Sequence, residues 1–312
     1  MAKCAFIFPG QGSQYMGMGK DLAEKHSVAK SVFQEADRVL GYDLSSIIFE
    51  GDEKELRRTE ITQPAIMTTS IAILEVLKEK GIRPEAVAGL SLGEYSALVC
   101  AGVLNFREAL LIVQERARLM QYTVPQGSGE MAAILGLESK EVEELCQQSS
   151  SFGCVEPANY NCPGQVVVAG QKEAVEELCR LARLRKARAV PLSVSAPFHC
   201  SLLSPLEEKM SDLLKEVHFN RPFVPFVANI HARYLQSPEE IKRALASQVY
   251  NPVRWDESMR LLIKDGYDLF VEIGPGRVLT GFMKKISRDV KAIRVEDGET
   301  LSIFFKLLEE EV

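Results

Sequence analysis

The segment Gly89-Leu90-Ser91-Leu92-Gly93 follows a short apolar run, Ala86-Val87-Ala88, and leads into the mainly apolar segment Leu92–Val99. These patterns predict a strand, a sharp turn and a helix. A Gly-x-Ser-x-Gly sequence at such a turn is typical of a nucleophile elbow, in which small neighbours leave the serine oxygen open to a substrate. The amide N–H of Leu92 then faces the reaction centre and can bind a developing oxyanion. An ordinary glycine-rich turn also fits these five residues.

A second glycine-rich loop, Pro9-Gly10-Gln11-Gly12-Ser13, follows the apolar run Cys4–Phe8, which we interpret as a buried strand. The loop lacks the Gly-Lys-Ser/Thr of a phosphate-binding loop, and Tyr15 stands where a dinucleotide-binding motif has its third glycine. Its two glycines let Gln11 bring its own N–H close to another loop, as the second donor of an oxyanion hole requires. Considered alone, the loop also fits a simple strand-to-helix turn.

The composition is that of an ordinary globular protein, with 312 residues and a formal net charge of −6. The absence of a basic excess argues against nucleic-acid binding. The N-terminal apolar run is too short for a signal peptide, and no run approaches the ~18–20 apolar residues that a membrane helix needs. Seven scattered cysteines without a Cys-x-x-Cys pair favour reduced thiols over disulfides or a zinc site. We therefore expect a cytoplasmic protein without a metal site.

The domain organisation follows from a change of pattern in the middle of the chain. Strand-like and helical segments alternate on both sides of residues 127–194, which predicts a parallel sheet covered on both faces. Within residues 127–194 the pattern is βαββαβ, the ferredoxin-like order. We therefore expect an α/β protein with a discontinuous large domain, 1–126 and 195–312, and an inserted small domain, 127–194.

Several local expectations accompany this organisation. They are one helix over Met18–Leu40, a turn over Asp43–Gly51, a helix that starts at Thr62, a strand near a sheet edge at Pro222–Asn229 and a loop over Gln248–Trp255. Gln63 can either cap the helix that begins beside it or face a site. The basic run from Arg180 to Arg188 fits either a solvated surface or a docking patch for an acidic partner.

A serine nucleophile needs a base, and four histidines are available: His26, His199, His218 and His231. His199 lies in a loop of small residues where the large domain resumes, so we choose it as the base, although an ordinary hydrogen-bonded loop histidine remains the alternative. Arg116 occupies a helix beside core positions. It is either a cation that extends to solvent over an apolar stem or a buried cation that awaits an anion.

Seven motifs, in order and over nearly the whole chain, resemble those of bacterial malonyl-CoA:acyl carrier protein transacylases. They are Gly10-Gln11-Gly12-Ser13-Gln14, Gly89-Leu90-Ser91-Leu92-Gly93-Glu94, Gln114-Glu115-Arg116, Asn159-Tyr160-Asn161-Cys162-Pro163-Gly164-Gln165, Pro197-Phe198-His199, Tyr250-Asn251-Pro252-Val253-Arg254-Trp255 and Glu272-Ile273-Gly274-Pro275-Gly276. The resemblance implies an α/β-hydrolase-like large domain with a ferredoxin-like insert.

The resemblance also implies a reaction. Malonyl passes from malonyl-CoA to Ser91 and then to the phosphopantetheine thiol of an acyl carrier protein, for fatty acid synthesis and without a cofactor. His199 matches the base, and the amides of Gln11 and Leu92 match the oxyanion hole. Gln248 matches the residue whose backbone carbonyl orients the histidine, so the third member is not an acid, unlike that of a Ser-His-Asp triad.

Three substrate-binding assignments come from the same resemblance. Arg116 matches the residue that binds the free carboxylate of malonate. Phe198 resembles the aromatic residue of malonyl-selective members, whose ring crowds a branched α-carbon, and Asn161 is similar to a residue near the thioester arm. The chain departs from the family at Leu90, where a histidine is usual, and we expect altered packing or substrate fit there.

Other classes of protein remain as alternatives. A serine hydrolase would share the elbow but send the acyl group to water. A polyketide synthase acyltransferase acting in trans would use the same residues with another carrier protein. A catalytically silent docking module would not need Ser91, His199 and Arg116 together.

Overall fold

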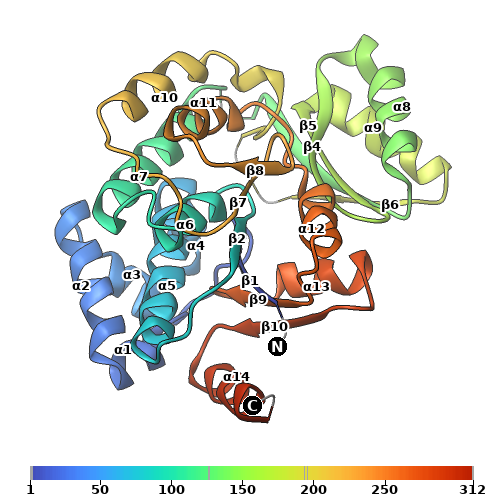
Figure 1. The fold of residues 1–312 in the computed structure, drawn as a ribbon. Helices are drawn as coiled ribbons and strands as arrows, with labels where there is room; N and C mark the ends of the chain where they lie inside the picture. The colour runs from blue at the N-terminus through green and yellow to red at the C-terminus, as the bar shows by residue number, and fades with distance from the viewer. Residues whose placement is uncertain (1–2, 126, 193, 195, 311–312) are drawn as a thin grey trace.

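The computed structural model describes residues 3–125, 127–192, 194 and 196–310, which form two sheets with their helices (Figure 1). In this part of the chain, the larger sheet has six strands in the order β10-β9-β1-β2-β7-β8. Neighbouring strands are parallel except for the antiparallel pair β7 and β8. The strands are β1 (Cys4–Phe8), β2 (Ala86–Gly89), β7 (Phe226–Ala228), β8 (Arg233–Leu235), β9 (Leu269–Ile273) and β10 (Lys291–Val295).

Both faces of the larger sheet are buried, as the sequence predicts. Successive side chains of a strand point to opposite faces, and β1 shows this alternation clearly. Phe6 and Phe8 pack into the core beneath one layer of helices, whereas Ala5 and Ile7 pack against Trp255 on the other side. A nearly continuous apolar run is what a parallel strand covered on both faces requires.

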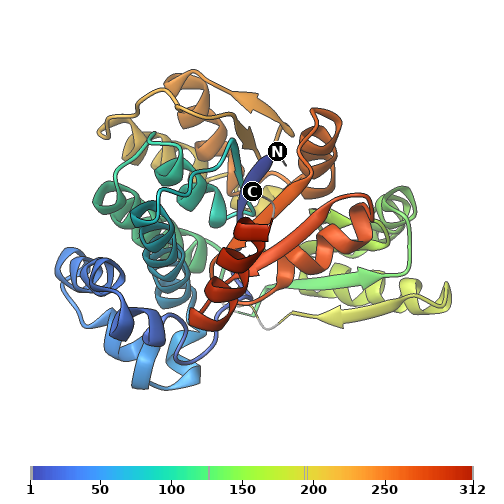
Figure 2. The same ribbon diagram turned by 60° about the horizontal axis from the view of Figure 1, so that its bottom comes forward.

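The helices of the larger unit form two layers on the sheet. One layer includes α2, α5, α6 and α7, and the other includes α12 and α13. Figure 2 shows α14 at the front, beside β10. The helices are α1 (Lys20–Lys25), α2 (Ser27–Leu40), α3 (Leu44–Glu50), α4 (Glu53–Leu56), α5 (Thr59–Glu79), α6 (Gly93–Cys100), α7 (Phe106–Tyr122), α10 (Leu206–Lys215), α11 (Pro238–Gln248), α12 (Trp255–Lys264), α13 (Val278–Ile286) and α14 (Gly298–Glu310), with a 3-10 turn at Ser201–Leu203.

The smaller sheet is antiparallel, with the order β4-β5-β3-β6. Its elements are β3 (Gly129–Leu135), α8 (Ser139–Ser149), a 3-10 turn (Ser150–Phe152), β4 (Val155–Cys162), β5 (Gln165–Gln171), α9 (Lys172–Leu184) and β6 (Arg188–Pro191). Both helices pack on one face, and the first and last strands lie side by side. This βαββαβ order confirms the predicted ferredoxin-like fold.

The predicted fold class is therefore confirmed as an α/β protein with a mostly parallel large sheet and a small antiparallel unit. The domain limits, 1–126 with 195–312 and 127–194, stay a prediction. Residues 126 and 195, at which two of these limits fall, lie outside the described residues.

Several local expectations were wrong. Met18–Leu40 is two helices separated by the extended residue His26, and Asp43–Gly51 is not a turn, because Asp43 caps α3 by accepting a bond from the Ser46 N–H at 2.9 Å. The helix expected from Thr62 begins at Thr59, so Pro64 lies inside it.

In the C-terminal half, the expected strand was too long and two helix ends were misplaced. β7 is shorter than expected but lies near the sheet edge as expected, beside the antiparallel edge strand β8, which was not predicted. Gln248 is the last residue of α11 rather than part of a loop, and Trp255 already begins α12. β10 and α14 were also not predicted.

The β2–α6 turn lies directly against the loop that follows β1. Leu90 donates its N–H to the Phe8 carbonyl at 2.9 Å. A Cβ on Gly93 would lie 2.1 Å from the Phe8 carbonyl oxygen, and a Cβ on Gly89 would lie 1.9 Å from the Gly93 oxygen. The two predicted oxyanion loops are therefore neighbours because glycine permits backbone contact between them.

We expect Gly93→Ala to lower the free energy of unfolding by about 1–3 kcal/mol or more, because the added methyl meets backbone atoms that cannot rotate away. Urea denaturation measures this loss. Gly281→Ala is the matched control, since nothing lies within 4 Å of its Cβ position inside α13, and it should stabilise by about 0.5–1 kcal/mol. Wild-type stability of Gly93→Ala would contradict the close contact.

Candidate active site

Ser91 is held in a strained conformation at the turn between β2 and α6, with a φ of 54°. Non-glycine residues rarely adopt positive φ, and such strain persists only where neighbours fix it. Asn229, just after β7, supplies that constraint. Its Oδ1 accepts the Ser91 N–H at 2.6 Å and its Nδ2 donates to the Gly89 carbonyl at 2.6 Å.

His199 lies beside the serine, 108 positions further along the chain. Its Nε2 is 2.7 Å from Ser91 Oγ, and its Nδ1 is 2.9 Å from the backbone oxygen of Gln248 at the end of α11. A carbonyl oxygen only accepts, so Nδ1 carries the proton and Nε2 is free to accept one. His199 itself has a φ of 61°, and its N–H donates to the Val249 carbonyl at 3.0 Å.

The electrostatics keep this imidazole neutral. Burial lowers the pKa of His199 to about 4, and the nearby positive charge of Arg116 acts in the same direction. The hydrogen bond to the Gln248 backbone has the opposite effect but is the smaller influence. The ring can therefore accept a proton at neutral pH.

Arg116, on α7, is fully buried and its guanidinium lies against the serine. Its Nη2 donates to Ser91 Oγ at 3.1 Å and to Gln248 Oε1 at 2.7 Å, and its Nη1 donates to Gln63 Oε1 at 2.6 Å. Tyr95 lies under the guanidinium, with its ring centroid 5.5 Å from Cζ. Arg116 is therefore a buried cation, and Gln63 faces the site rather than capping its helix.

Glu94, in the first turn of α6, is a buried acid that is linked to this cation through the Gln248 side chain. Its Oε2 accepts from Gln248 Nε2, and its Oε1 accepts the Asn229 N–H at 3.2 Å. Burial raises the pKa of Glu94 to about 7, while these hydrogen bonds and the Arg116 charge act in the opposite direction.

A cavity of about 650 Å³ opens over Ser91 and His199. Phe198 and Asn161, both largely buried, contribute to its wall. Gln11 and Leu92 also line it, and in the described part of the chain neither backbone N–H has a protein acceptor. Many of the other lining side chains are apolar, among them Leu90, Met120, Met131, Ala133, Val167, Leu192, Val194, Val278 and Phe282, and the polar ones include Glu53, Arg57 and Asn159.

Six of the eight predicted site residues line this cavity, and the other two, Arg116 and Gln248, contact Ser91 from behind it. Arg116 does not line the cavity itself. Ser91 and Gln63 line the cavity, and Arg116 is hydrogen-bonded to both of them. The roles assigned to these residues remain predictions, whereas their placement together is an observation.

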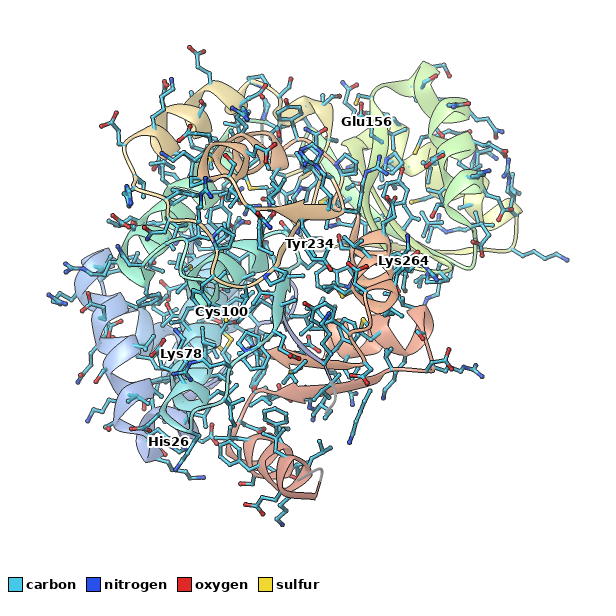
Figure 3. The ribbon with its side chains drawn as sticks, in the orientation of Figure 1. His26, Lys78, Cys100, Glu156, Tyr234 and Lys264 are labelled. Atoms are coloured by element: carbon cyan, nitrogen blue, oxygen red, sulfur yellow. The ribbon has the colours of Figure 1, made fainter. Side chains whose placement is uncertain are left out.

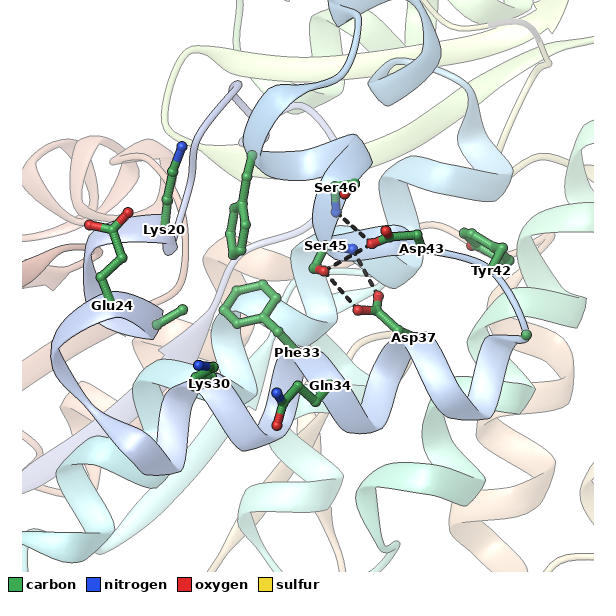
Figure 4. Close-up of a pocket in the computed structure, with 13 residues that line it drawn as sticks. Lys20, Glu24, Lys30, Phe33, Gln34, Asp37, Tyr42, Asp43, Ser45 and Ser46 are labelled. Atoms are coloured by element: carbon green, nitrogen blue, oxygen red, sulfur yellow. Dashed lines mark hydrogen bonds between the residues drawn. The ribbon is translucent and has the colours of Figure 1, made fainter.

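The other histidines lie apart from this centre. His218 and His231 are exposed, and His26 lies between α1 and α2, at the side of the molecule away from the small unit (Figure 3). A hollow of about 840 Å³ also lies over α1–α3. Its acids Asp37 and Asp43 accept hydrogen bonds from Ser45 and Ser46, so they serve the start of α3 (Figure 4).

Sequence reasoning missed two residues of the network, Glu94 and Asn229. Glu94 stands inside the quoted elbow motif, and an acid in a helix whose other residues are apolar was a usable signal. Asn229 had no comparable signal, because its contact with the elbow joins positions 138 residues apart. Among the described residues, no group of three or more His, Cys, Asp or Glu side chains is arranged to hold a metal ion.

Comparison with known proteins agrees with this geometry. A family model described as "Acyl transferase domain" matches residues 5–303. The chain is 47% identical to the malonyl CoA-acyl carrier protein transacylase of Bacillus subtilis (strain 168), over 100% of this chain and 99% of that protein.

Two solved structures resemble the whole chain. The acyl carrier protein S-malonyltransferase of Vibrio cholerae superposes with a TM-score of 0.94 at 44% identity, covering 97% of this chain and 100% of that one. A malonyl-transacylase in complex with its type II polyketide synthase acyl-carrier protein superposes with a TM-score of 0.94 at 45% identity, covering 96% of this chain and 98% of that one.

Fold and site together define a serine acyltransferase, with a nucleophile elbow and a buried cation beside it. Within that class, the chain belongs to the malonyl CoA-acyl carrier protein transacylase family.

We expect an NMR titration of the His199 imidazole to show a pKa near 4, well below the ordinary value of about 6.5. Removing the neighbouring cation by Arg116→Ala should raise that pKa, because a positive charge disfavours the imidazolium ion. His199→Gln assigns the resonance. A titration near 6.5 in the wild-type protein, unchanged in Arg116→Ala, would be incompatible with a buried neutral base beside a cation.

Proposed function

We propose that this chain transfers malonyl from malonyl-CoA to the phosphopantetheine thiol of an acyl carrier protein through a malonyl-Ser91 intermediate, supplying fatty acid synthesis. The observation that carries the proposal is the convergence of three groups. A hydroxyl, a neutral imidazole and a buried guanidinium meet within hydrogen-bond distance, at Ser91, His199 and Arg116. The first two make an acyl-enzyme, and the third selects an acyl group that carries a carboxylate.

In the first half-reaction, His199 Nε2 takes the proton of Ser91 as Oγ attacks the thioester carbonyl. The tetrahedral oxyanion accepts hydrogen bonds from the N–H groups of Gln11 and Leu92, which have no acceptor among the residues that the structure describes. When the C–S bond breaks, the imidazolium returns the proton to the departing coenzyme A thiolate. The Gln248 carbonyl, 2.9 Å from Nδ1, stabilises the imidazolium and fixes the ring orientation.

The second half-reaction runs through the same groups in reverse. His199 takes the proton of the incoming phosphopantetheine thiol, and the sulfur attacks the Ser91 ester. Collapse of the oxyanion releases the serine, which recovers the proton from the imidazolium. No cofactor enters this sequence, because the base and the oxyanion donors supply the required proton and charge stabilisation.

Arg116 supports malonyl selectivity. A guanidinium has five N–H donors, and three are used by Gln63, Ser91 and Gln248. A substrate carboxylate takes the remaining donors and displaces the neutral acceptors that face the cavity, because charge-assisted bonds are roughly twice as strong as neutral ones. The planar fork matches a carboxylate in a way that lysine cannot.

The cavity wall supports the remaining substrate assignments. Phe198 places an aromatic ring next to His199, where it would crowd a branched α-carbon and exclude methylmalonyl. Asn161 would contact the thioester arm from β4. Leu90, where the family usually has histidine, adds apolar surface to the wall and leaves the reacting atoms untouched.

The basic run from Arg180 to Arg188, at the end of α9 and the start of β6, is the proposed docking region for the acidic carrier protein. Arg180 pairs with Glu177 at 2.8 Å and Arg185 with Glu144 at 3.4 Å, so part of the run serves the small unit itself. Lys186 and Arg188 are exposed beside these pairs and are available to a partner.

We assign the domains as residues 1–126 with 195–312 and residues 127–194, and the location as the cytoplasm. Cys100, Cys146, Cys154, Cys162, Cys179 and Cys200 are free thiols, which suits a reducing compartment. Across the described residues, no helix is long and apolar enough to cross a bilayer.

Two other functions differ from the proposed one in the molecule that accepts the malonyl group. A serine acyl hydrolase would release malonate to water, whereas the buried arginine and the lack of an acidic triad partner favour transfer. A polyketide synthase carrier is the second candidate acceptor, because one similar structure holds such a carrier.

We expect malonyl-CoA to label the enzyme with one malonyl group, detected by intact-mass spectrometry and mapped to Ser91. Holo acyl carrier protein should then remove the label far faster than buffer does, and Ser91→Ala should not be labelled. Rapid loss of the label to water would indicate a hydrolase. No label at all would indicate a catalytically silent module.

We expect Arg116→Ala to cost malonyl transfer ~2–5 kcal/mol, the usual loss when one partner of a buried charge pair is removed. Loading from acetyl-CoA should suffer less, since acetyl has no carboxylate to bind. Single-turnover rates with both thioesters measure the two effects. Equal losses for malonyl and acetyl would refute the carboxylate-binding role.

A further inference from the structure

Glu94 is a buried carboxylate that the reaction described above does not use. Its residue is only 2% exposed, on a helix whose other residues are all buried and mostly apolar. Burying an acid in such surroundings costs free energy of desolvation unless hydrogen bonds compensate for it. Both of its oxygens accept N–H donors, one from the Gln248 side chain and one from the Asn229 backbone.

The bond to Gln248 fixes which way that amide points. An amide side chain has a donor end and an acceptor end that differ little in shape, so its neighbours decide its orientation. Glu94 accepts from Nε2, and therefore Oε1 faces Arg116, to which it is bonded at 2.7 Å. The same Nε2 also donates to the Ser91 carbonyl at 3.0 Å.

We infer that Glu94 is a positioning residue for the carboxylate-binding arginine, acting through the Gln248 amide. The carboxylate compels Gln248 to offer an acceptor, rather than a donor, to the guanidinium. Gln248 thereby holds the Arg116 guanidinium in the position where Arg116 Nη2 also donates to Ser91 Oγ. The same guanidinium then positions both the carboxylate of the acyl group and the nucleophile. This inference rests on the proposed malonyl transfer.

A glutamine at position 94 would exchange donors and acceptors along the series of hydrogen bonds that runs through Gln248 to Arg116. The Asn229 backbone N–H is fixed at the end of β7, so a glutamine at 94 turns its own oxygen toward Asn229. Its NH2 group then faces Gln248, which must flip to accept. The flipped Gln248 presents N–H donors to Arg116, and the guanidinium loses one acceptor and its fixed position.

The test compares Glu94→Gln with a matched control, Glu272→Gln. Glu272 is also fully buried but accepts from Leu279 and Thr280 at the start of α13, away from Arg116. We expect Glu94→Gln to lower the ratio of malonyl to acetyl single-turnover loading about 10- to 100-fold, the effect of one lost hydrogen bond to a charged group. Glu272→Gln should leave that ratio unchanged, whatever its effect on stability.

Equal losses for malonyl and acetyl in Glu94→Gln would overturn the inference, since a packing defect does not discriminate between acyl groups. Wild-type enzyme that fails to load malonyl would instead overturn the proposed function. Neutron diffraction from wild-type crystals gives a second readout that needs no variant. Deuterons on the Gln248 atom that faces Glu94 support the inference, and deuterons on the atom that faces Arg116 contradict it.

Discussion

A guanidinium enclosed in the protein interior is the constraint on which the site depends. Arg116 cannot lose its proton, and water does not reach it, so every N–H group needs an acceptor from the protein or from a ligand. Gln63, Ser91 and Gln248 come from three separate elements to provide acceptors. The arrangement links the helices around the site and leaves the cation ready to exchange a neutral acceptor for a charged one.

The reacting pair is held by strain that the surrounding fold resists. Ser91 and His199 both have positive φ, which is unfavourable for residues with a Cβ. The contacts that fix them are long-range, from Asn229 to the elbow and from Val249 to the histidine loop. Such contacts exist only in the folded state, so the site is assembled by the whole large sheet and not by the local motif. The cost of the two conformations is offset by packing elsewhere.

Much of the fold could be predicted because the periodicity is strong and local. The strand Cys4–Phe8, the strand and helix on either side of the Ser91 turn and the βαββαβ unit depend on spacing within one segment, and the structure places them as expected. The errors occur in short elements, which show too little of a period to be recognised. Asp43 starts a helix of 7 residues, and the antiparallel β8 has only 3.

The site residues also divide into those that a local sequence pattern predicts and those that it does not. Ser91 and its glycines form a local pattern, and the small-residue loop around His199 favoured that histidine as the base. The roles of Arg116 and Gln248 came only from the resemblance to a family. Asn229 was not found, because its contact with the elbow joins positions 138 residues apart. Glu94 was overlooked, although an acid in an otherwise largely apolar helix was a usable signal. A sequence pattern reports which residue types are present, but the orientation of one buried amide requires coordinates.

The most direct measurement is a crystal structure of the enzyme after reaction with malonyl-CoA in the absence of carrier protein. We expect an ester on Ser91 whose free carboxylate lies about 3 Å from the Arg116 guanidinium nitrogens. Its ester carbonyl should face the amides of Gln11 and Leu92. An ester whose carboxylate points out of the cavity, with Arg116 still bonded to Gln63 and Ser91, would show that Arg116 does not bind the malonyl carboxylate.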